Sequence, residues 1–167
     1  MEKSIKAIES YLSFTLENET FAVNVHKVLE VLEKQHITKV PNAPHYIKGV
    51  INFRGEVIPV IESRDKFNMS PRTSDDKLVI IVLDVKKATG NLMVAAIADQ
   101  VQDVLEIQPE EIAAVPEMGS NYNTEFILGM VKADEGFMMI LDTDRIFSED
   151  EIALLNSEKF HEAEAVH

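Results

Sequence analysis

The sequence predicts an all-β protein with short helices, and three observations indicate this fold class. Apolar runs of strand length recur along the chain, separated by turn residues. The two halves carry similar motifs in the same order. Residues 47–61, reading IKGVINFRGEVIPVI, form the clearest hairpin pattern, because β-branched runs flank the Arg54-Gly55 pair. We therefore expect two related β units packed together, followed by a C-terminal helix.

The central hairpin predicts an exposed arginine. Gly55 supplies the positive φ angle of a tight turn, so the turn should lift Arg54 towards solvent. Pro59 has no N–H group for a ladder and predicts that the second strand is an edge or bulged strand. The plain alternative is a hairpin whose arginine is simply solvated.

The N-terminal part of the chain predicts another hairpin. Residues 1–9 are polar, and we expect them to fray. Residues 11–16 and 20–25 fit strands around a turn at Asn18-Glu19. Apolar and polar residues alternate in the first of these strands, which predicts that one face is buried.

Between the two hairpins the pattern is less regular. Residues 26–32 fit a helical turn or the start of a strand, and both alternatives stay open. Residues 37–44 carry two prolines and predict an extended loop. Residues 65–67 suggest one helical turn, and residues 70–77, reading SPRTSDDK, predict a surface loop that tolerates insertion.

The second half of the chain opens with a long apolar run. Residues 78–85 predict a strand buried on both faces. Residues 92–98 and 101–107 are also β-like, so the three runs together predict a meander. Residues 108–125 predict a looser connection that contains two prolines.

The chain ends in a predicted hairpin and a predicted helix. Residues 127–131 and 137–141 fit strands on either side of a turn that ends at Gly136. Residues 148–160 fit a helix, because a capping-box pattern stands at its start and apolar residues follow at helical spacing.

Similar motifs in both halves predict two units built on one plan. The corresponding pairs are ITKVP at 37–41 and IAAVP at 112–116, YIKGVI at 46–51 and FILGMV at 126–131, IPVI at 58–61 and MMIL at 138–141, and Val28 and Val31 with Val101 and Val104. We expect one domain over residues 1–167, with two small β-barrel subdomains at roughly 10–75 and 76–147 and an added helix at 148–160. Chance similarity between amphipathic strands is the alternative.

Composition limits the classes of function. The chain has 167 residues, and its formal net charge of -13 disfavours binding to nucleic acid or anionic membrane surfaces. The absence of cysteine excludes disulfides and thiolate metal sites and fits a reducing compartment. Neither a signal-peptide core nor an apolar run long enough to span a bilayer occurs, so we expect a cytoplasmic protein with no direct membrane insertion.

No residue pattern predicts catalysis, a cofactor or a metal. The five histidines lack metal-ligand spacing, and the Asp142 and Asp144 pair lacks the spacing of a calcium loop. Glycine-rich phosphate loops and Gly-x-Ser-x-Gly elbows are absent. We therefore expect a protein that is not an enzyme. A small β-barrel ligand-binding protein or an enzyme that uses surface carboxylates is the alternative.

Five segments of the chain resemble the CheW coupling-protein family of bacterial chemosensory systems. They read FTLENETFAVNVHKVLEVL, ITKVPNAPHYIKGVINFRGEVIPVI, LVIIVLDV, IADQVQDVLEI and FILGMV. The whole match runs in order from about residue 11 to residue 155. The resemblance implies two interlocked SH3-like β barrels. One departure is Glu62-Ser63, where the family commonly has Asp-Leu; it touches a strand end only.

The same resemblance implies a non-catalytic adaptor that works without a cofactor. Its partners would be the cytoplasmic tips of chemoreceptors and the regulatory domain of a CheA-type histidine kinase, and the protein would be recruited to membrane-associated receptor arrays. Val28 and Glu30 fall on the family's Val-x-Glu positions. Gly49, Arg54 and Gly55 fall on its glycine and Arg-Gly positions. These five residues are the expected partner-binding residues.

Overall fold

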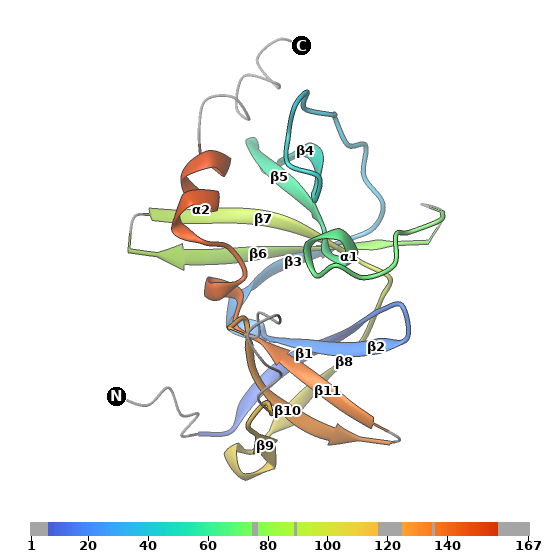
Figure 1. Cartoon of the computed structure of the whole chain (residues 1–167), viewed down its shortest axis with the longest axis vertical. Coiled ribbons are helices and arrows are strands. Elements are labelled where there is room, and N and C mark those ends of the chain that lie inside the picture. The colour runs from blue at the N-terminus through green and yellow to red at the C-terminus, as the bar shows by residue number, and fades with distance from the viewer. Residues whose placement is uncertain (1–6, 75–76, 89, 117–124, 135, 157–167) are drawn as a thin grey trace.

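The computed structural model describes residues 7–74, 77–88, 90–116, 125–134 and 136–156. Its strands form two sheets, which lie one above the other in Figure 1. Sheet A has six strands in the order β8-β1-β2-β11-β10-β9. These strands are β1 (Glu9–Leu16), β2 (Glu19–Asn24), β8 (Gln100–Ile107), β9 (Ile112–Ala113), β10 (Ile127–Ala133) and β11 (Gly136–Leu141).

Sheet B has five strands in the order β3-β6-β7-β5-β4. They are β3 (Val28–Leu32), β4 (Ile47–Phe53), β5 (Glu56–Glu62), β6 (Val79–Lys87) and β7 (Gly90–Ala98). Short helices join or follow the strands: η1 (Val25–Lys27), α1 (Ser63–Lys66), η2 (Pro109–Glu111), η3 (Thr143–Arg145) and α2 (Glu149–Leu155). The prediction of an all-β protein with short helices and a C-terminal helix is confirmed.

The two sheets repeat one plan of strand order. In each, a central antiparallel hairpin, β6–β7 or β1–β2, stands between an edge strand, β3 or β8, and a second hairpin, β4–β5 or β10–β11. The second hairpin joins the first through a parallel pair, β5 with β7 or β11 with β2. The motif correspondence between the halves therefore reflects repeated structure.

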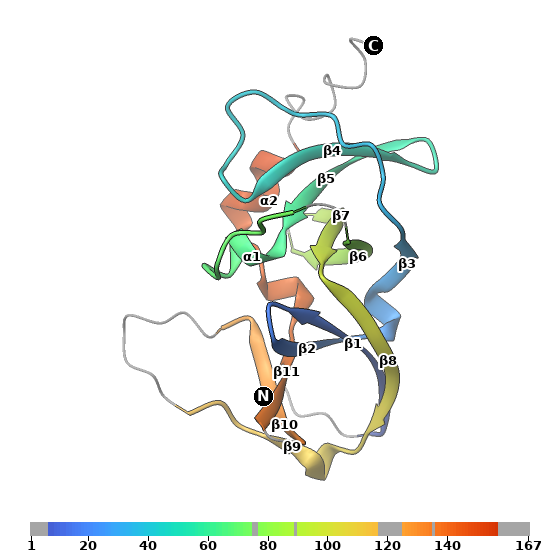
Figure 2. The same ribbon diagram turned by 90° about the vertical axis from the view of Figure 1, so that its right-hand side faces the viewer.

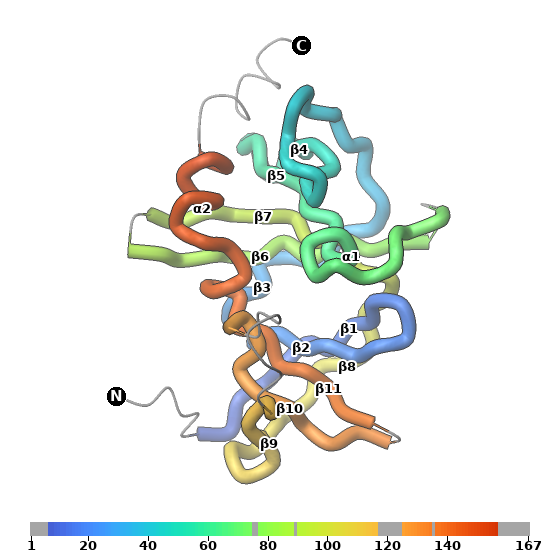
Figure 3. The backbone as a smooth tube through the Cα atoms, in the orientation of Figure 1, coloured from blue at the N-terminus to red at the C-terminus, as the bar shows by residue number. Residues whose placement is uncertain are grey.

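Each sheet nevertheless mixes the two halves of the chain. Hairpin β1–β2 lies in sheet A with strands of the second half, and hairpin β6–β7 lies in sheet B with strands of the first half. The tube in Figure 3 shows the blue β1–β2 segment beside the orange β10–β11 segment. A boundary near residue 75 separates the two sequence repeats, but each sheet contains strands from both repeats. The expected ranges 10–75 and 76–147 therefore do not correspond to the two barrels. The barrels interlock because each half gives its first hairpin to the other.

This interlocking produces three apolar clusters. A central core draws residues from both sheets and α2, including Phe14, Ile81 and Leu155. A second cluster comes from sheet B with Leu78, and a third comes from sheet A alone. Strand β1 faces two of these clusters, since Phe14 lies in the central core and Tyr11 in the sheet A core. The expectation of one buried face was therefore incomplete.

Several boundaries differ from the sequence-based predictions. The first hairpin turns at Glu17-Asn18, one residue earlier than expected, because Leu16 pairs with Glu19. Both alternatives for residues 26–32 hold in part, since η1 leads directly into β3. The predicted meander is wrong, because β8 leaves sheet B and pairs with β1 in sheet A.

Pro59 lies in an inner strand, which contradicts the first alternative of the predicted edge or bulged strand; the β4–β5 ladder does shift register, but between Ile47 and Gly49 of β4. Strand β5 pairs with β4 along its length but with β7 only from Val60 onwards. In the β4–β5 ladder Pro59 stands opposite Val50, whose N–H donates to Thr38 and not to β5. Proline is tolerated because neither neighbour needs an N–H at that position.

Helix α2 begins with the predicted capping box. The Ser148 side chain accepts from the Glu151 backbone, and the Glu151 side chain accepts from the Ser148 backbone. Glu151 also accepts from the Tyr46 hydroxyl at 2.8 Å and pairs with Lys66 at 3.2 Å. Helix α2 is therefore held by polar contacts with Tyr46, just before β4, and with Lys66 of α1, as well as by its apolar face. The helix ends at Leu155, and the predicted part beyond residue 156 lies outside the described residues.

Candidate partner-binding surface

The central hairpin turn holds Arg54 in a fixed position. The backbone has positive φ at Arg54 (53°) and at Gly55 (87°), which matches the twist of the flanking strands. The Gly55 N–H donates to the Asn52 side chain at 3.0 Å and so closes the turn. A Cβ atom at Gly55 would meet open space, so glycine is needed there for the backbone angle alone.

Arg54 is exposed, as predicted, but it already has an acidic partner. Its Nη2 atom lies 2.6 Å from Oε1 of Glu30 on β3, and its guanidinium lies 4.7 Å from the centre of the Phe53 ring. The two charged side chains are 65% and 41% exposed. The structure therefore brings Glu30, Arg54 and Gly55 together at one end of sheet B. Arg54, which the sequence predicts to point towards solvent, is thus also part of an intramolecular ion pair.

Val28 and Gly49 occupy different surroundings. The half-buried Val28 packs against the central core, and the ladder shifts register between it and Glu30. Gly49 is buried on β4 with φ of 150°, and a Cβ atom there would overlap the carbonyl oxygen of Thr38. Gly129 on β10 faces Ile112 in the same way. Packing of a neighbouring segment therefore accounts for glycine at both repeat-related positions.

Four exposed apolar residues were not among the predicted site residues. Leu29 and Val31 on β3 are 39% and 42% exposed, and Val104 and Leu105 on β8 are 61% and 37% exposed. Strands β3 and β8 are edge strands of their sheets, and Figure 2 shows them one after the other along one flank. Apolar side chains on open strand edges are typical of protein interfaces. The repeat correspondence of Val31 with Val104 was the sequence signal that pointed to them.

A buried charge network supports the base of the hairpin. Glu62 at the end of β5 is 1% exposed and pairs with Arg72 at 2.8 Å. Arg72 also pairs with Asp99 at 2.9 Å, and Asp99 pairs with Arg64 at 2.6 Å and accepts from the Glu17 backbone. The side chain of Arg72 is 6% exposed. The 70–77 segment is therefore anchored by a buried arginine, which corrects its description as a simple surface loop.

The network sets the charge state of Asp99. Burial alone would raise the pKa of Asp99, but hydrogen bonds from Arg64 and the Glu17 amide, with the charge of Arg72, lower it below its ordinary value. The pKa of Glu151 is lowered in the same manner by Ser148, Tyr46 and Lys66 against the effect of burial. Both carboxylates are thus held ionised by their partners.

Two further properties concern the described residues alone. They contain no group of three or more His, Cys, Asp or Glu side chains arranged to hold a metal ion. None of the helices among them has the length and apolar character needed to cross a bilayer.

Comparison with known families identifies close similarity over most of the chain. A family model described as the CheW-like domain matches residues 10–151. The chain is 33% identical over 149 residues to the chemotaxis protein CheW of Klebsiella aerogenes, covering 89% of this chain and 87% of that protein. It is 29% identical over 150 residues to the chemotaxis protein CheW of Bacillus subtilis, covering 90% and 94% of the two chains.

A solved structure shares the architecture. The crystal structure of the scaffolding protein TtCheW from Thermoanaerobacter tengcongensis superposes with a TM-score of 0.75 at 27% identity. The match covers 86% of this chain and 95% of that one. The resemblance of five short segments thus extends to nearly the whole fold.

Proposed function

This chain belongs to the CheW family, and we propose that it couples the cytoplasmic tips of chemoreceptors to the regulatory domain of a CheA-type histidine kinase. Such a protein is an adaptor in chemotaxis signalling and not an enzyme. Its relatives are named as chemotaxis and scaffolding proteins, which favours the adaptor over a small enzyme that uses surface carboxylates. The proposal places the protein in the cytoplasm, at membrane-associated receptor arrays.

The observation that carries this proposal is the pair of edge strands with outward apolar residues. Strands β3 and β8 belong to different sheets. The affinity of a partner that contacts both strands would therefore depend on the relative position of the two barrels. Glu30, which pairs with Arg54 of the β4–β5 turn, lies on the same strand as Leu29 and Val31. Apolar area with charged groups at its side is the usual composition of a protein–protein interface.

We assign Val28, Glu30, Gly49, Arg54 and Gly55 different parts in this proposal. Glu30 and Arg54 offer charges that a partner can reach, while Gly55 shapes the turn that carries Arg54. Gly49 and Val28 act through packing, because Gly49 fits against Thr38 and Val28 supports β3 from the core side.

Calorimetry with the purified regulatory domain of a CheA-type histidine kinase tests the proposal directly. Interfaces of this kind are modest in area, and we expect a dissociation constant of about 1–10 μM. Co-sedimentation with receptor signalling fragments and kinase should show assembly that depends on this protein. Absence of binding heat at about 100 μM, together with absence of assembly, would overturn the proposal.

A further inference from the structure

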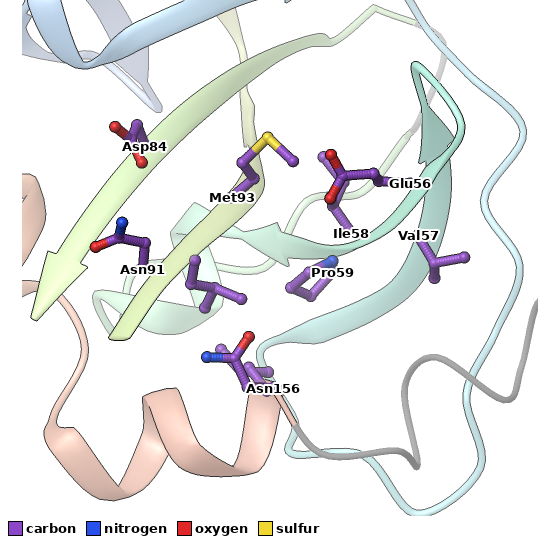
Figure 4. A pocket seen from close by; sticks show the side chains of 10 residues that line it. Glu56, Val57, Ile58, Pro59, Asp84, Asn91, Met93 and Asn156 are labelled. Atoms are coloured by element: carbon purple, nitrogen blue, oxygen red, sulfur yellow. The ribbon is translucent and has the colours of Figure 1, made fainter. Parts of the chain in front are cut away.

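Two neighbouring inner strands of sheet B, β5 and β7, diverge and leave a notch between them. Strand β5 pairs with β7 only at Val60, Ile61 and Glu62. Before Val60 the two strands separate, and the gap forms a groove of about 230 Å³. Figure 4 shows its walls, with Glu56 and Pro59 on β5, Asn91 on β7, and Asn156 at the end of α2. We call the ten residues that line this groove the β5–β7 notch: Glu56, Val57, Ile58, Pro59, Asp84, Asn91, Leu92, Met93, Leu155 and Asn156.

Sheet A offers no such opening at the corresponding place among its described residues. Its parallel pair, β11 with β2, begins at Thr20, the second residue of β2. The corresponding strand of sheet B, β7, runs for five residues, Gly90–Val94, before its parallel pairing begins at Ala95. The longer β6–β7 hairpin therefore creates the notch, and the barrel plan itself does not require it.

Main-chain hydrogen-bonding groups face into the notch from both sides. The two-residue turn makes Phe53 and Glu56 a hydrogen-bonded pair, so the alternation of an antiparallel ladder directs the N–H and C=O of Val57 away from β4. On the other wall, Ala95 pairs with Val60 of β5, and the same alternation directs Met93 and Asn91 away from β6. The β5–β7 ladder among the described residues consists of Val60 with Ala95, Ile61 with Ala96 and Glu62 with Ile97, and it includes none of these three residues.

The side chains of the notch favour a basic, partly apolar occupant. Its lining contains the carboxylates of Glu56 and Asp84 and neither lysine nor arginine. Asp84 has Lys86 near it, with Nζ 3.8 Å from Oδ2, but the lysine side chain is 60% exposed. The net charge of -13 strengthens the attraction for a cationic segment. Valine, isoleucine, proline and leucine side chains supply the apolar part of the lining.

We propose that the β5–β7 notch binds an extended basic segment of a partner protein, which adds to sheet B between the facing edges of β5 and β7. Peptide main chain would satisfy the groups of Val57, Asn91 and Met93, and alternate side chains of the segment would reach the carboxylates. The β5–β7 notch contains none of the predicted partner-binding residues. Peptide binding in the notch therefore does not depend on the function proposed above.

The test uses the full chain labelled with ¹⁵N and a short blocked peptide in which valine alternates with lysine. We expect saturable shifts of the amide signals of Val57, Asn91 and Met93, and none with a peptide in which glutamate replaces lysine. Glu56→Lys should weaken binding about tenfold. The matched control is Glu19→Lys, which makes the same charge change at the exposed start of β2 and should bind as the unaltered chain does.

Three results would overturn the proposal. The first is a titration without saturable shifts up to about 1 mM peptide. The second is a set of shifts confined to β3 and β8, which would assign the peptide to the open edge strands. The third is a shift of the notch amides with protein concentration in the absence of peptide, which would make a second copy of this chain the occupant. A peptide N-methylated at alternate residues should lose binding, since it lacks the donors that strand addition needs.

Discussion

The guanidinium of Arg54 and the carboxylate of Glu30 form a 2.6 Å ion pair between the tip of the β4–β5 hairpin and strand β3. Strands β3 and β4 are the two edges of sheet B. The pair therefore connects the two edges of sheet B, which the curvature of the barrel brings towards each other. Along β3, Glu30 stands between the exposed residues Leu29 and Val31.

Charge reversal at Arg54 should weaken partner binding more than it weakens folding. Arg54→Glu replaces attraction to Glu30 with repulsion, but both side chains are well exposed, so unfolding free energy should fall by only about 0.5–1 kcal/mol. Binding to kinase or receptor should weaken by about 2 kcal/mol if a partner group meets this pair. Denaturant unfolding and calorimetry measure the two effects on the same sample.

The exchanged variant, Glu30→Arg with Arg54→Glu, is the control. It restores the internal pair with opposite polarity, so stability should recover while binding stays weak. Recovery of binding would mean that partners recognise only the shape held by the pair, and unaltered binding of Arg54→Glu would remove Arg54 from the interface.

Exposed apolar residues on β8 should matter for assembly and not for folding. Val104 is 61% exposed, so Val104→Asp should change unfolding free energy by about 0.5 kcal/mol or less. Co-sedimentation with receptor and kinase should fall sharply, because the aspartate would be buried in the interface. Phe137→Asp is the matched control, since Phe137 is 53% exposed on a different hairpin. Equal loss of assembly in both variants would contradict a specific role for β8.

Glycine at position 49 should be required by packing. Gly49→Ala places a methyl group into the Thr38 carbonyl at a positive φ angle, and we expect about 2–4 kcal/mol of destabilisation. Gly55→Ala meets open space and should lose only about 1 kcal/mol from its backbone angle. Gly129→Ala tests the repeat and should lose less than Gly49→Ala, because Gly129 has no positive φ angle and its added methyl group meets the side chain of Ile112 first. Thermal or urea unfolding gives all three values, and a folded, stable Gly49→Ala protein would refute the packing argument.

Substitution of only one partner of the buried Glu62–Arg72 pair should lower the free energy of unfolding strongly. Glu62 is only 1% exposed, and Arg72→Ala removes the main cation that pairs with its carboxylate. We expect the free energy of unfolding to fall by about 3–5 kcal/mol. The double variant Glu62→Gln with Arg72→Met should lose less than Arg72→Ala, because no buried carboxylate is then left unpaired. Lys77→Ala, an exposed cation of the same segment, serves as the control in urea unfolding.

Stability should fall in acid through carboxylates whose pKa the fold lowers. Asp99 and Glu151 have folded-state pKa values below the ordinary 3.8 and 4.5, so the folded state binds these protons less readily than the unfolded state. Their stabilisation is complete above those ordinary values and is lost as pH falls through the lower folded values. Urea unfolding between about pH 7 and pH 3 should show this decline. Asp99→Asn should reduce the slope, because it removes a carboxylate whose pKa the fold lowers.

The local elements could be predicted from sequence because their causes are local. Alternation of apolar residues, the Arg54-Gly55 turn and the Ser148 capping box each depend on neighbours within a few residues. The repeated motifs likewise predicted two related units, and the family resemblance supplied the adaptor function. Glycine at residues 49 and 55 was identified by the same resemblance, though its physical reasons differ between the two positions.

Only the tertiary structure decided which strands pair across the two halves. Strand β8 leaves β7 and pairs with β1, which no local pattern encodes, because the choice depends on burying two cores at once. The same long-range packing buries Arg72 of a polar loop beside Glu62, and it opens a notch where β5 and β7 diverge. Periodicity and turn chemistry thus determined the strands of this protein, while contacts between residues far apart in the chain determined its edges, its buried charges and its grooves.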